Sequence, residues 1–256
     1  MLFRSATGLR INKAGDDAAG MAVSERLKNQ VRGLNQAARN AQDGVSLIQT
    51  AEGAMGEAHN LLARMRELAV QAANDTLTST DRSNILTEFT SLYAEIDRIA
   101  TSTQFNGVAI LTGGSTALSL QVGANSNNSL VNDNVISLNI TPGGSFYASV
   151  LSPTMTDMGV TSQSVANLAI STIDAAINAV STARTSIGSM QSRMESASRS
   201  IAVASENAAA ANSRIADADI ASSMSELVRA QILQQAGISV LAQANQAPSL
   251  VLQLLK

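Results

Sequence analysis

The chain has 256 residues, a net charge of −3 and a pI of about 5.2, so it lacks the basic surface expected of a nucleic-acid-binding protein. Hydrophobic residues make up 45% of the sequence but aromatic residues only 2%, which favours thin helix-on-helix seams over a thick globular core. There is no cysteine, which excludes disulfides and thiolate metal sites, and no run of about 18 apolar residues predicts a membrane span. The N-terminus shows no secretory signal, which by itself predicts a cytosolic protein.

The first predicted element is a long helix from about Asp17 to Asn74, a stretch without proline. Its apolar residues recur at alternating steps of four and three, with one repeated step of three from Ile48 to Ala51. This spacing predicts a coiled-coil seam with one stammer, on the order of 70 Å long, and either Asp16 or Asp17 is the expected N-cap. The seam residues are Leu27, Val31, Leu34, Ala38, Ala41, Val45, Ile48, Ala51, Met55, Ala58, Leu62, Met65, Ala69 and Ala72.

A shorter helix is predicted over residues 81–102, with Ser79, Thr80 or Asp81 as its cap. Its apolar stripe consists of Ile85, Phe89, Leu92, Ile96 and Ile99. Two short strands are predicted next, because apolar and polar residues alternate there between Gly, Asn and Pro boundaries. The apolar positions of the strands are Leu118, Leu120 and Val122, and then Ile136, Leu138 and Ile140. Residues 141–162 are expected to be irregular.

A second long seam follows, and Pro142, Pro153 and Pro248 all fall outside the two predicted long helices. Its residues are Ile170, Ile173, Ile177, Val180, Ala183, Ile187, Met190, Met194, Ala197, Ile201, Ala204, Ala208, Ala211 and Ile215. The predicted fold is therefore mainly α, an elongated antiparallel helical rod of long coiled-coil helices with a small β-hairpin region.

The last segment, residues 220–256, predicts a helix with one apolar stripe but carries only three charged residues and six glutamines. Glutamine can hydrogen-bond in a crowded interface without the cost of burying a charge, so we interpret this helix as an assembly element packed by copies of itself. The alternative is an amphipathic tail that folds back on its own rod. The candidate self-assembly residues are Met224, Leu227, Val228, Ile232, Gln234, Gln235, Val240, Leu241 and Gln243.

No catalytic, cofactor-binding or metal site is predicted, so the chain is not expected to be an enzyme. The single histidine, His59, cannot form a catalytic triad alone, and Asp217 and Asp219 are interpreted as helix caps. Arg64, Glu67 and Leu68 flank the seam and are expected to point away from the core. They form either a solvated face or a contact surface for another subunit or a receptor.

Several sequence blocks, in this order, resemble bacterial flagellin. They are GLRINKAGDDAAGMAVSERL, RNAQDGVSLIQTAEGAM, RMRELAVQAAN, EIDRIATSTQFNGVAIL and RAQILQQAGISVLAQANQ, and the likeness covers about residues 7–140 and 164–256. The resemblance implies a structural subunit that assembles into the flagellar filament for swimming motility. It also implies an extracellular location after type III export without a cleaved signal peptide, which replaces the cytosolic prediction.

The resemblance further implies a set of partners: other flagellin subunits, the flagellar cap and hook–filament junction proteins, and an export chaperone. An innate immune receptor, the Toll-like receptor for flagellin, is a further implied partner, and neither nucleic acid nor membrane insertion is expected. By resemblance the receptor contacts are Arg64, Leu68 and Glu88, with Ala63 where receptor-activating flagellins commonly carry glutamine. The alternatives are a hook–filament junction protein, or a coiled-coil signalling rod, which would need membrane spans.

The expected domain organisation follows the family. Residues 1–16 are expected to be the remnant of an N-terminal inner-layer segment, because flagellins normally carry a further helix before the GLRIN block. Residues 17–140 form the N-terminal part of the rod, 141–163 a connector in place of outer variable domains, 164–215 the C-terminal rod helix, and 216–256 the inner-layer assembly helix.

Overall fold

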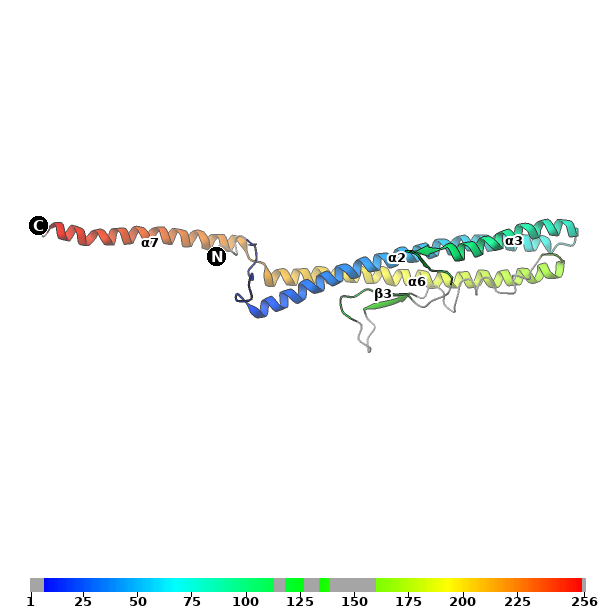
Figure 1. Cartoon of the computed structure of the whole chain (residues 1–256), viewed down its shortest axis with the longest axis horizontal. Coiled ribbons are helices and arrows are strands. Elements are labelled where there is room, and N and C mark those ends of the chain that lie inside the picture. The colour runs from blue at the N-terminus through cyan, green and yellow to red at the C-terminus, as the bar shows by residue number, and fades with distance from the viewer. Residues whose placement is uncertain (1–6, 113–117, 127–133, 139–159, 255–256) are drawn as a thin grey trace. The chain divides into compact units, whose positions relative to one another are not determined.

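A computed structural model describes residues 7–112, 118–126, 134–138 and 160–254, with side chains described as far as residue 244 (Figure 1). The helices are α2 (Ala18–Ala72), α3 (Ser79–Ser102), α6 (Gln163–Ala216) and α7 (Ile220–Leu254). The strands are β1 (Gln104–Phe105), β2 (Val108–Ala109), β3 (Leu118–Gln121) and β4 (Val135–Leu138). Contacts group residues 33–203 into one compact unit, the central unit, and residues 1–32 with 204–256 into another, the terminal unit.

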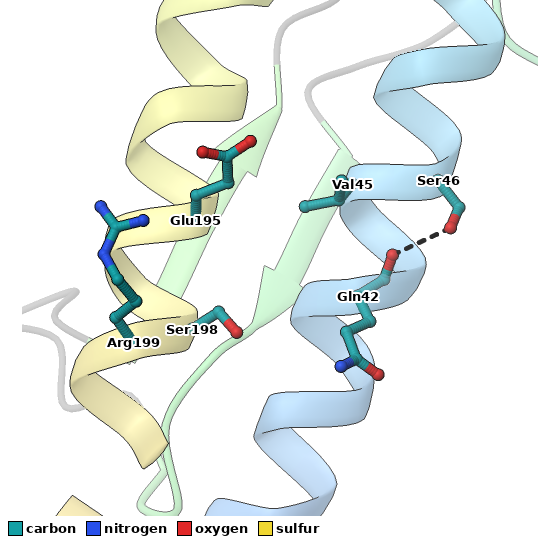
Figure 2. A pocket seen from close by; sticks show the side chains of 6 residues that line it. All are labelled: Gln42, Val45, Ser46, Glu195, Ser198 and Arg199. Carbon is teal, nitrogen blue, oxygen red and sulfur yellow. Dashed lines mark hydrogen bonds between the residues drawn. The ribbon is translucent and has the colours of Figure 1, made fainter. Parts of the chain in front are cut away.

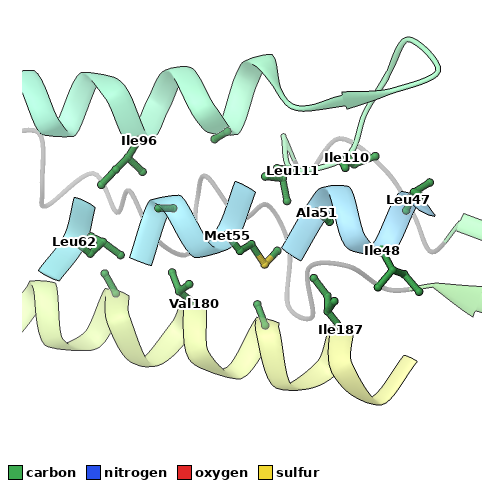
Figure 3. Packing of buried hydrophobic residues seen from close by; sticks show 14 of the residues in the cluster. Leu47, Ile48, Ala51, Met55, Leu62, Ile96, Ile110, Leu111, Val180 and Ile187 are labelled. Atoms are coloured by element: carbon green, nitrogen blue, oxygen red, sulfur yellow. The ribbon is translucent and has the colours of Figure 1, made fainter. Parts of the chain in front are cut away.

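The central unit is built on a seam between α2 and α6, which run antiparallel, with α3 on the other side of α2 (Figure 3). Met55, Leu62 and Met65 of α2 are fully buried, as are Val180 and Ile187 of α6. Every predicted seam residue of α2 from Leu34 to Ala72 is buried or half-buried, so the heptad prediction is confirmed there. The mainly α prediction is confirmed as well.

The prediction for α6 is wrong at one position, since Ala204 is exposed. Ser205, four residues after the buried Ile201, is half-buried in its place, and Ala208 is buried again. Between Ile201 and Ala208 a helix can place its buried residue after three residues or after four. The prediction chose the first, at Ala204, because alanine is apolar, whereas the structure uses the second, at Ser205.

Both strand pairs are antiparallel hairpins. The predicted strands pair as β3 and β4, with Leu120 opposite Ile136, and Asn40 of α2 donates its side-chain amide to the Gln121 carbonyl over 3.0 Å. The β1–β2 hairpin was not predicted. Its turn is Asn106-Gly107, where φ is +50° and +77°, the pair of positive angles that a type I′ turn requires. The Asn-Gly dipeptide is the signal that would have predicted it.

The cap of α3 is Thr78, not Ser79, Thr80 or Asp81, because the helix begins two residues earlier than predicted. The Thr78 hydroxyl accepts from Asp81 N, and the Asp81 carboxylate accepts from Thr78 N over 3.0 Å, which together form a capping box. At α2, Asp17 is confirmed as a cap, since its carboxylate accepts from Gly20 N over 2.8 Å. Asp16 instead accepts from the backbone amides of Asn12 and Lys13.

Pro248 lies outside the two long helices, as predicted, and within α7, which continues to Leu254. Of the residues singled out above, Ile140, Pro142, Pro153 and most of 141–162 lie outside the described residues.

The terminal unit joins the start of the chain to the end of α6. Ser24 is buried and donates its hydroxyl to the side-chain oxygen of Asn212 over 2.7 Å. Arg10 N donates to the Ala216 carbonyl over 2.7 Å, and Leu9 lies opposite Asp217 in an isolated antiparallel bridge. These contacts tie segments about 200 residues apart in the chain, which local helix propensity alone does not achieve.

Replacing Thr78 with alanine tests the capping box. We expect the free energy of unfolding to fall by about 1 kcal/mol near neutral pH, because an orphan helix amide loses its acceptor. The pKa of Asp81 is lowered by hydrogen bonds from the Thr78 hydroxyl and then the Thr78 backbone amide. A carboxyl group whose pKa is lower in the folded state stabilises the fold when the pH is above the ordinary carboxyl pKa. This stabilisation is lost as the pH falls through the lowered pKa of the folded state.

The difference between the parent and Thr78→Ala should therefore shrink in acid, as measured by urea unfolding followed by circular dichroism at about pH 7 and about pH 3. Thr87→Ala is the matched control, since the Thr87 hydroxyl donates only to the Ser83 carbonyl within α3. Equal losses in the two variants would contradict the assignment of the cap.

Candidate functional site

The longest exposed apolar surface among the described side chains lies on α7. Every residue from Val228 to Ala244 is exposed, and the sequence has no charged residue between Arg229 and Lys256. The large apolar side chains after Val228 are more than half exposed: Ile232 (59%), Leu233 (66%), Ile238 (61%), Val240 (66%) and Leu241 (64%). Burying one such side chain is worth about 1.5 to 3 kcal/mol, so covering this surface with other protein would stabilise the helix substantially.

These apolar residues do not form the single stripe that the sequence predicted. At about 100° per residue, Leu233, Ile238 and Leu241 point to sides of α7 away from Ile232. The apolar residues are consequently spread around the helix instead of gathered on one face. A helix that is apolar all round is expected to be surrounded by other protein on several sides.

The candidate self-assembly residues all lie on α7, and eight of the nine are exposed. Leu227 is half-buried, whereas Met224 and Val228 are 44% and 48% exposed. Gln234, Gln235 and Gln243 are exposed between the apolar residues, where their amides can pair with neighbours without burying a charge. Sequence reasoning missed Leu233 and Ile238 because it followed only one face of the helix.

Asp219 fixes where α7 begins. Its carboxylate accepts from Ser222 N over 3.1 Å, and its carbonyl accepts from Ser223 N over 3.0 Å. This is the geometry of an N-cap, so the interpretation of Asp219 as a cap is confirmed. Asp217 instead accepts from the Ser213 hydroxyl over 2.6 Å, at the end of α6.

A second surface of interest lies where α3 packs beside α2. Arg64 donates to Glu88 of α3 over 3.0 Å and to Glu67 over 2.9 Å. These two hydrogen bonds, Glu67 first, raise the pKa of Arg64. The side chains of Arg64 and Glu88 are 51% and 46% exposed, so the ion pair is screened by water and contributes little stability.

Leu68 does not belong to this surface, which corrects the prediction that it points away from the core. It is only 2% exposed. The reason is a second apolar row on α2, in which Leu47, Ala54, Leu61 and Leu68 follow one another at intervals of seven residues. A helix packed between two others needs two apolar faces, and the sequence analysis considered one. The structure thus brings Arg64 and Glu88 together at the surface and buries Leu68 in the core.

A shallow groove between α2 and α6 is a third feature, and sequence reasoning did not identify it (Figure 2). Its lining residues are Gln42, Val45, Ser46, Glu195, Ser198 and Arg199. The Ser46 hydroxyl donates to the Gln42 carbonyl, within its own helix, and so is not paired with a base.

The described part of the chain shows no cluster of three His, Asp or Glu residues that could hold a metal ion. His59 is half-buried on α2, and its Nδ1 is buried without a hydrogen-bond partner. Within the same described residues, no helix combines the length and the apolar character needed to cross a membrane.

Comparison with known families gives two matches. The profile of the bacterial flagellin N-terminal helical region matches residues 2–116, and that of the bacterial flagellin C-terminal helical region matches residues 170–255. Flagellin of Halalkalibacterium halodurans is 47% identical over 250 residues, covering 98% of this chain and 89% of the relative. Flagellin of Bacillus subtilis is 41% identical over 273 residues, covering 98% and 90%.

Two solved structures are similar to this one. Bacillus cereus flagellin matches with a TM-score of 0.54 and 29% identity, over 64% of this chain and 88% of that chain. A putative flagellar hook-associated protein from Vibrio parahaemolyticus matches with a TM-score of 0.62, over 79% of this chain and 100% of that chain. At 15% identity the second likeness concerns the fold alone.

Replacing Leu68 with alanine tests its corrected position. We expect the free energy of unfolding to fall by about 2 to 5 kcal/mol, because the substitution leaves a cavity between packed helices. Val70→Ala is the control, since Val70 is 49% exposed on the same helix and should change stability by no more than about 0.5 kcal/mol. Urea unfolding measures both, and an unchanged midpoint for Leu68→Ala would show that this side chain is not packed in solution.

Proposed function

Because this chain belongs to the bacterial flagellin family and is a structural subunit of the flagellar filament, we propose that α7 is the element through which copies of the chain contact one another. The observation that carries the proposal is the unbroken exposure of residues 228–244. Flagellins polymerise with themselves, so the expected cover for this surface is α7 and neighbouring segments of other subunits.

The composition of α7 supports a contact with identical copies more than one with a charged partner. In a homo-polymer a charge on α7 is repeated on every copy, so helices packed together would bring like charges close, and a buried unpaired charge is costly. The stretch from Ala230 to Ala244 contains none, and glutamines occupy the polar positions. The alternative of an amphipathic tail fits less well, because such a tail would carry its apolar residues on one face.

The other functions considered from the sequence are less well supported. The curated relatives are flagellins and flagellar filament core proteins, including one from Treponema maltophilum at 41% identity over 97% of this chain. A hook–filament junction role therefore rests on a likeness of fold to the hook-associated protein. A coiled-coil signalling rod has no comparable relative among the similar proteins described above.

We further infer contacts with the flagellar cap, the hook–filament junction proteins and an export chaperone, and export by the type III route without a cleaved signal peptide. These inferences rest on family membership alone. The exposed α7 is the segment that we expect a chaperone to cover before export, because exposed apolar helices otherwise associate prematurely.

Replacing Val240 with aspartate tests the role of α7. We expect the growth of filament seeds of a related flagellin by the full-length chain to fall at least about tenfold, which corresponds to about 1.4 kcal/mol per docking event. The reason is that docking would bury an unpaired carboxylate. Growth is followed by light scattering and electron microscopy.

Leu168→Asp is the matched control, because Leu168 is 59% exposed on α6, comparable to the 66% of Val240. It should grow seeds like the parent. Equal growth by Val240→Asp and the parent would contradict the proposal, and so would a parent that stays folded but never adds to seeds.

We also propose that Arg64 and Glu88 contribute to recognition by the flagellin-sensing Toll-like receptor. Their ion pair, with an Nη2–Oε1 distance of 2.9 Å, puts two of the three residues expected by resemblance side by side and exposed. Leu68, the third, would have to act from within the core by supporting this face, because only 2% of it is accessible.

Replacing Arg64 with alanine tests this surface. We expect the concentration needed for half-maximal signalling in receptor-expressing cells to rise by about tenfold or more, since arginine is a frequent hot-spot residue. Arg66→Ala is the control, because Arg66 is similarly exposed and similarly paired, its Nε lying 2.6 Å from Asp174 Oδ1. If both variants signal as strongly as the parent, receptor recognition does not use this face.

A further inference from the structure

The β1–β2 hairpin turns at Asn106-Gly107, the only Asn-Gly dipeptide of the sequence. Asparagine before glycine is chemically reactive, because glycine has no Cβ to hinder attack by its backbone nitrogen on the asparagine side chain. Both residues are exposed, and among the described residues a Cβ at Gly107 would meet nothing within 4 Å. Water can therefore reach the dipeptide, and ammonia can leave it, without displacing a packed side chain.

The reaction available to this dipeptide is deamidation through a five-membered ring. Gly107 N forms a bond to Asn106 Cγ, and the side-chain nitrogen leaves as ammonia, taking the proton of the Gly107 amide. The resulting succinimide then adds one water molecule, which breaks one of the two ring C–N bonds. One break gives aspartate, and the other gives isoaspartate, in which the main chain runs through Cβ. Water is the only co-reactant.

The closed hairpin holds Asn106 in a conformation that cannot form the ring. Its φ is +50° and that of Gly107 is +77°, as in a type I′ turn. Ring closure needs Asn106 Cβ and Gly107 N on the same side of the bond between Cα and the carbonyl carbon. In the left-handed region ψ is about +47°, which puts these two atoms on nearly opposite sides of that bond. The turn thus separates the two reacting groups.

We propose that Asn106 is a deamidation site that the closed β1–β2 hairpin protects and that the open hairpin releases. β1 and β2 have only two residues each, and beyond them Ile110 N donates to the Thr103 carbonyl over 3.3 Å. An element held by few, exposed backbone bonds opens more often than the core of the fold. The rate of deamidation in the folded chain therefore reports how often this hairpin opens.

The isoaspartyl product cannot return to the same hairpin. It places an extra main-chain atom in a turn whose two-residue length sets the register of the strands. Ile110 and Leu111, directly after β2, are only 7% and 0% exposed, so the path of the hairpin also positions core residues. Deamidation thus limits how long the chain can stay open and still regain this fold. The site lies in the central unit and does not depend on the proposed role of α7.

The first test measures the rate of deamidation at Asn106 in the full-length chain by tandem mass spectrometry. At one pH and temperature, the parent unfolded in guanidinium chloride should react at least about tenfold faster than the folded parent. Val108→Pro removes the amide that closes a two-residue turn onto the Phe105 carbonyl. In this variant, with its helices confirmed by circular dichroism, we expect a similar acceleration without denaturant.

Val108→Ala is the matched control, because it keeps the backbone amide, and Val108 is 52% exposed and so loses little packing. Its rate should equal that of the folded parent. Equal rates in the folded and the unfolded parent would overturn protection by the turn, and so would a parental rate in Val108→Pro. An unfolded chain in which Asn106 stays intact while other asparagines react would overturn the site itself.

The second test follows the product. The parent is aged in guanidinium chloride and refolded, and the isoaspartyl fraction is purified by chromatography. We expect the Ile110 amide, which bonds to the Thr103 carbonyl in the closed hairpin, to exchange at least about tenfold faster in this fraction than in the parent. Asn106→Asp is the matched control, since it carries the same added charge without the extra main-chain atom and should keep the parent's protection.

Parental protection of Ile110 in the isoaspartyl chain would overturn the inference that the product cannot close the hairpin. Loss of protection in Asn106→Asp as large as in the isoaspartyl chain would overturn it too, because charge alone would then be the cause. Every readout lies within residues 103–111 of the central unit. These outcomes therefore stay distinguishable from a failure of α7 to support filament growth.

Discussion

The close approach of α2 and α6 is the constraint on which the central unit depends. With aromatic residues at only 2% of the sequence, the core cannot be filled by large rings and must instead be thin. Ala41, Ala51, Ala58, Ala69 and Ala72 are fully buried on α2, so the helix backbones approach closely and the methionines and branched residues between them fill the remaining space. The small elements depend on the same seam. Gly44 of α2 faces Leu120 of β3, whose side chain would have to shift to admit a Cβ there.

Polar interactions in the central unit fix register more than they add stability. Arg66 pairs with Asp174 across α2 and α6, and Arg64 with Glu88 across α2 and α3, and all four side chains are about half exposed. Exposed pairs of this kind contribute little to the free energy of unfolding. Each ion pair nevertheless specifies which residue of one helix lies opposite which residue of its neighbour. A seam of similar alanines does not specify this register. The receptor surface proposed for Arg64 would thus use a residue that also aligns α3 on α2.

Sequence periodicity predicted the long helices and the β3–β4 hairpin because each signal is repeated many times. Errors arose where one residue or one extra face decided the outcome. Leu68 lies on a second apolar row that a single-seam analysis assigns to solvent, and Ala204 was preferred over Ser205 because alanine is apolar. The α6–α7 break was predicted, and its Asp219 cap is confirmed, but the contacts of residues 8–10 with the end of α6 were not predicted. Local patterns carry no information about contacts between such distant segments.

The two units differ in how they can be stabilised. The central unit buries most of its large apolar residues in a core formed within one chain. On α7 residues 228–244 are all exposed, and a helix of this kind is stabilised mainly by tertiary packing, not by propensity. Under the proposal that α7 contacts other copies, this packing comes from neighbouring subunits, so assembly and the stabilisation of α7 are coupled. The apolar residues that leave α7 without packing in one chain are then the same residues that bind the next subunit.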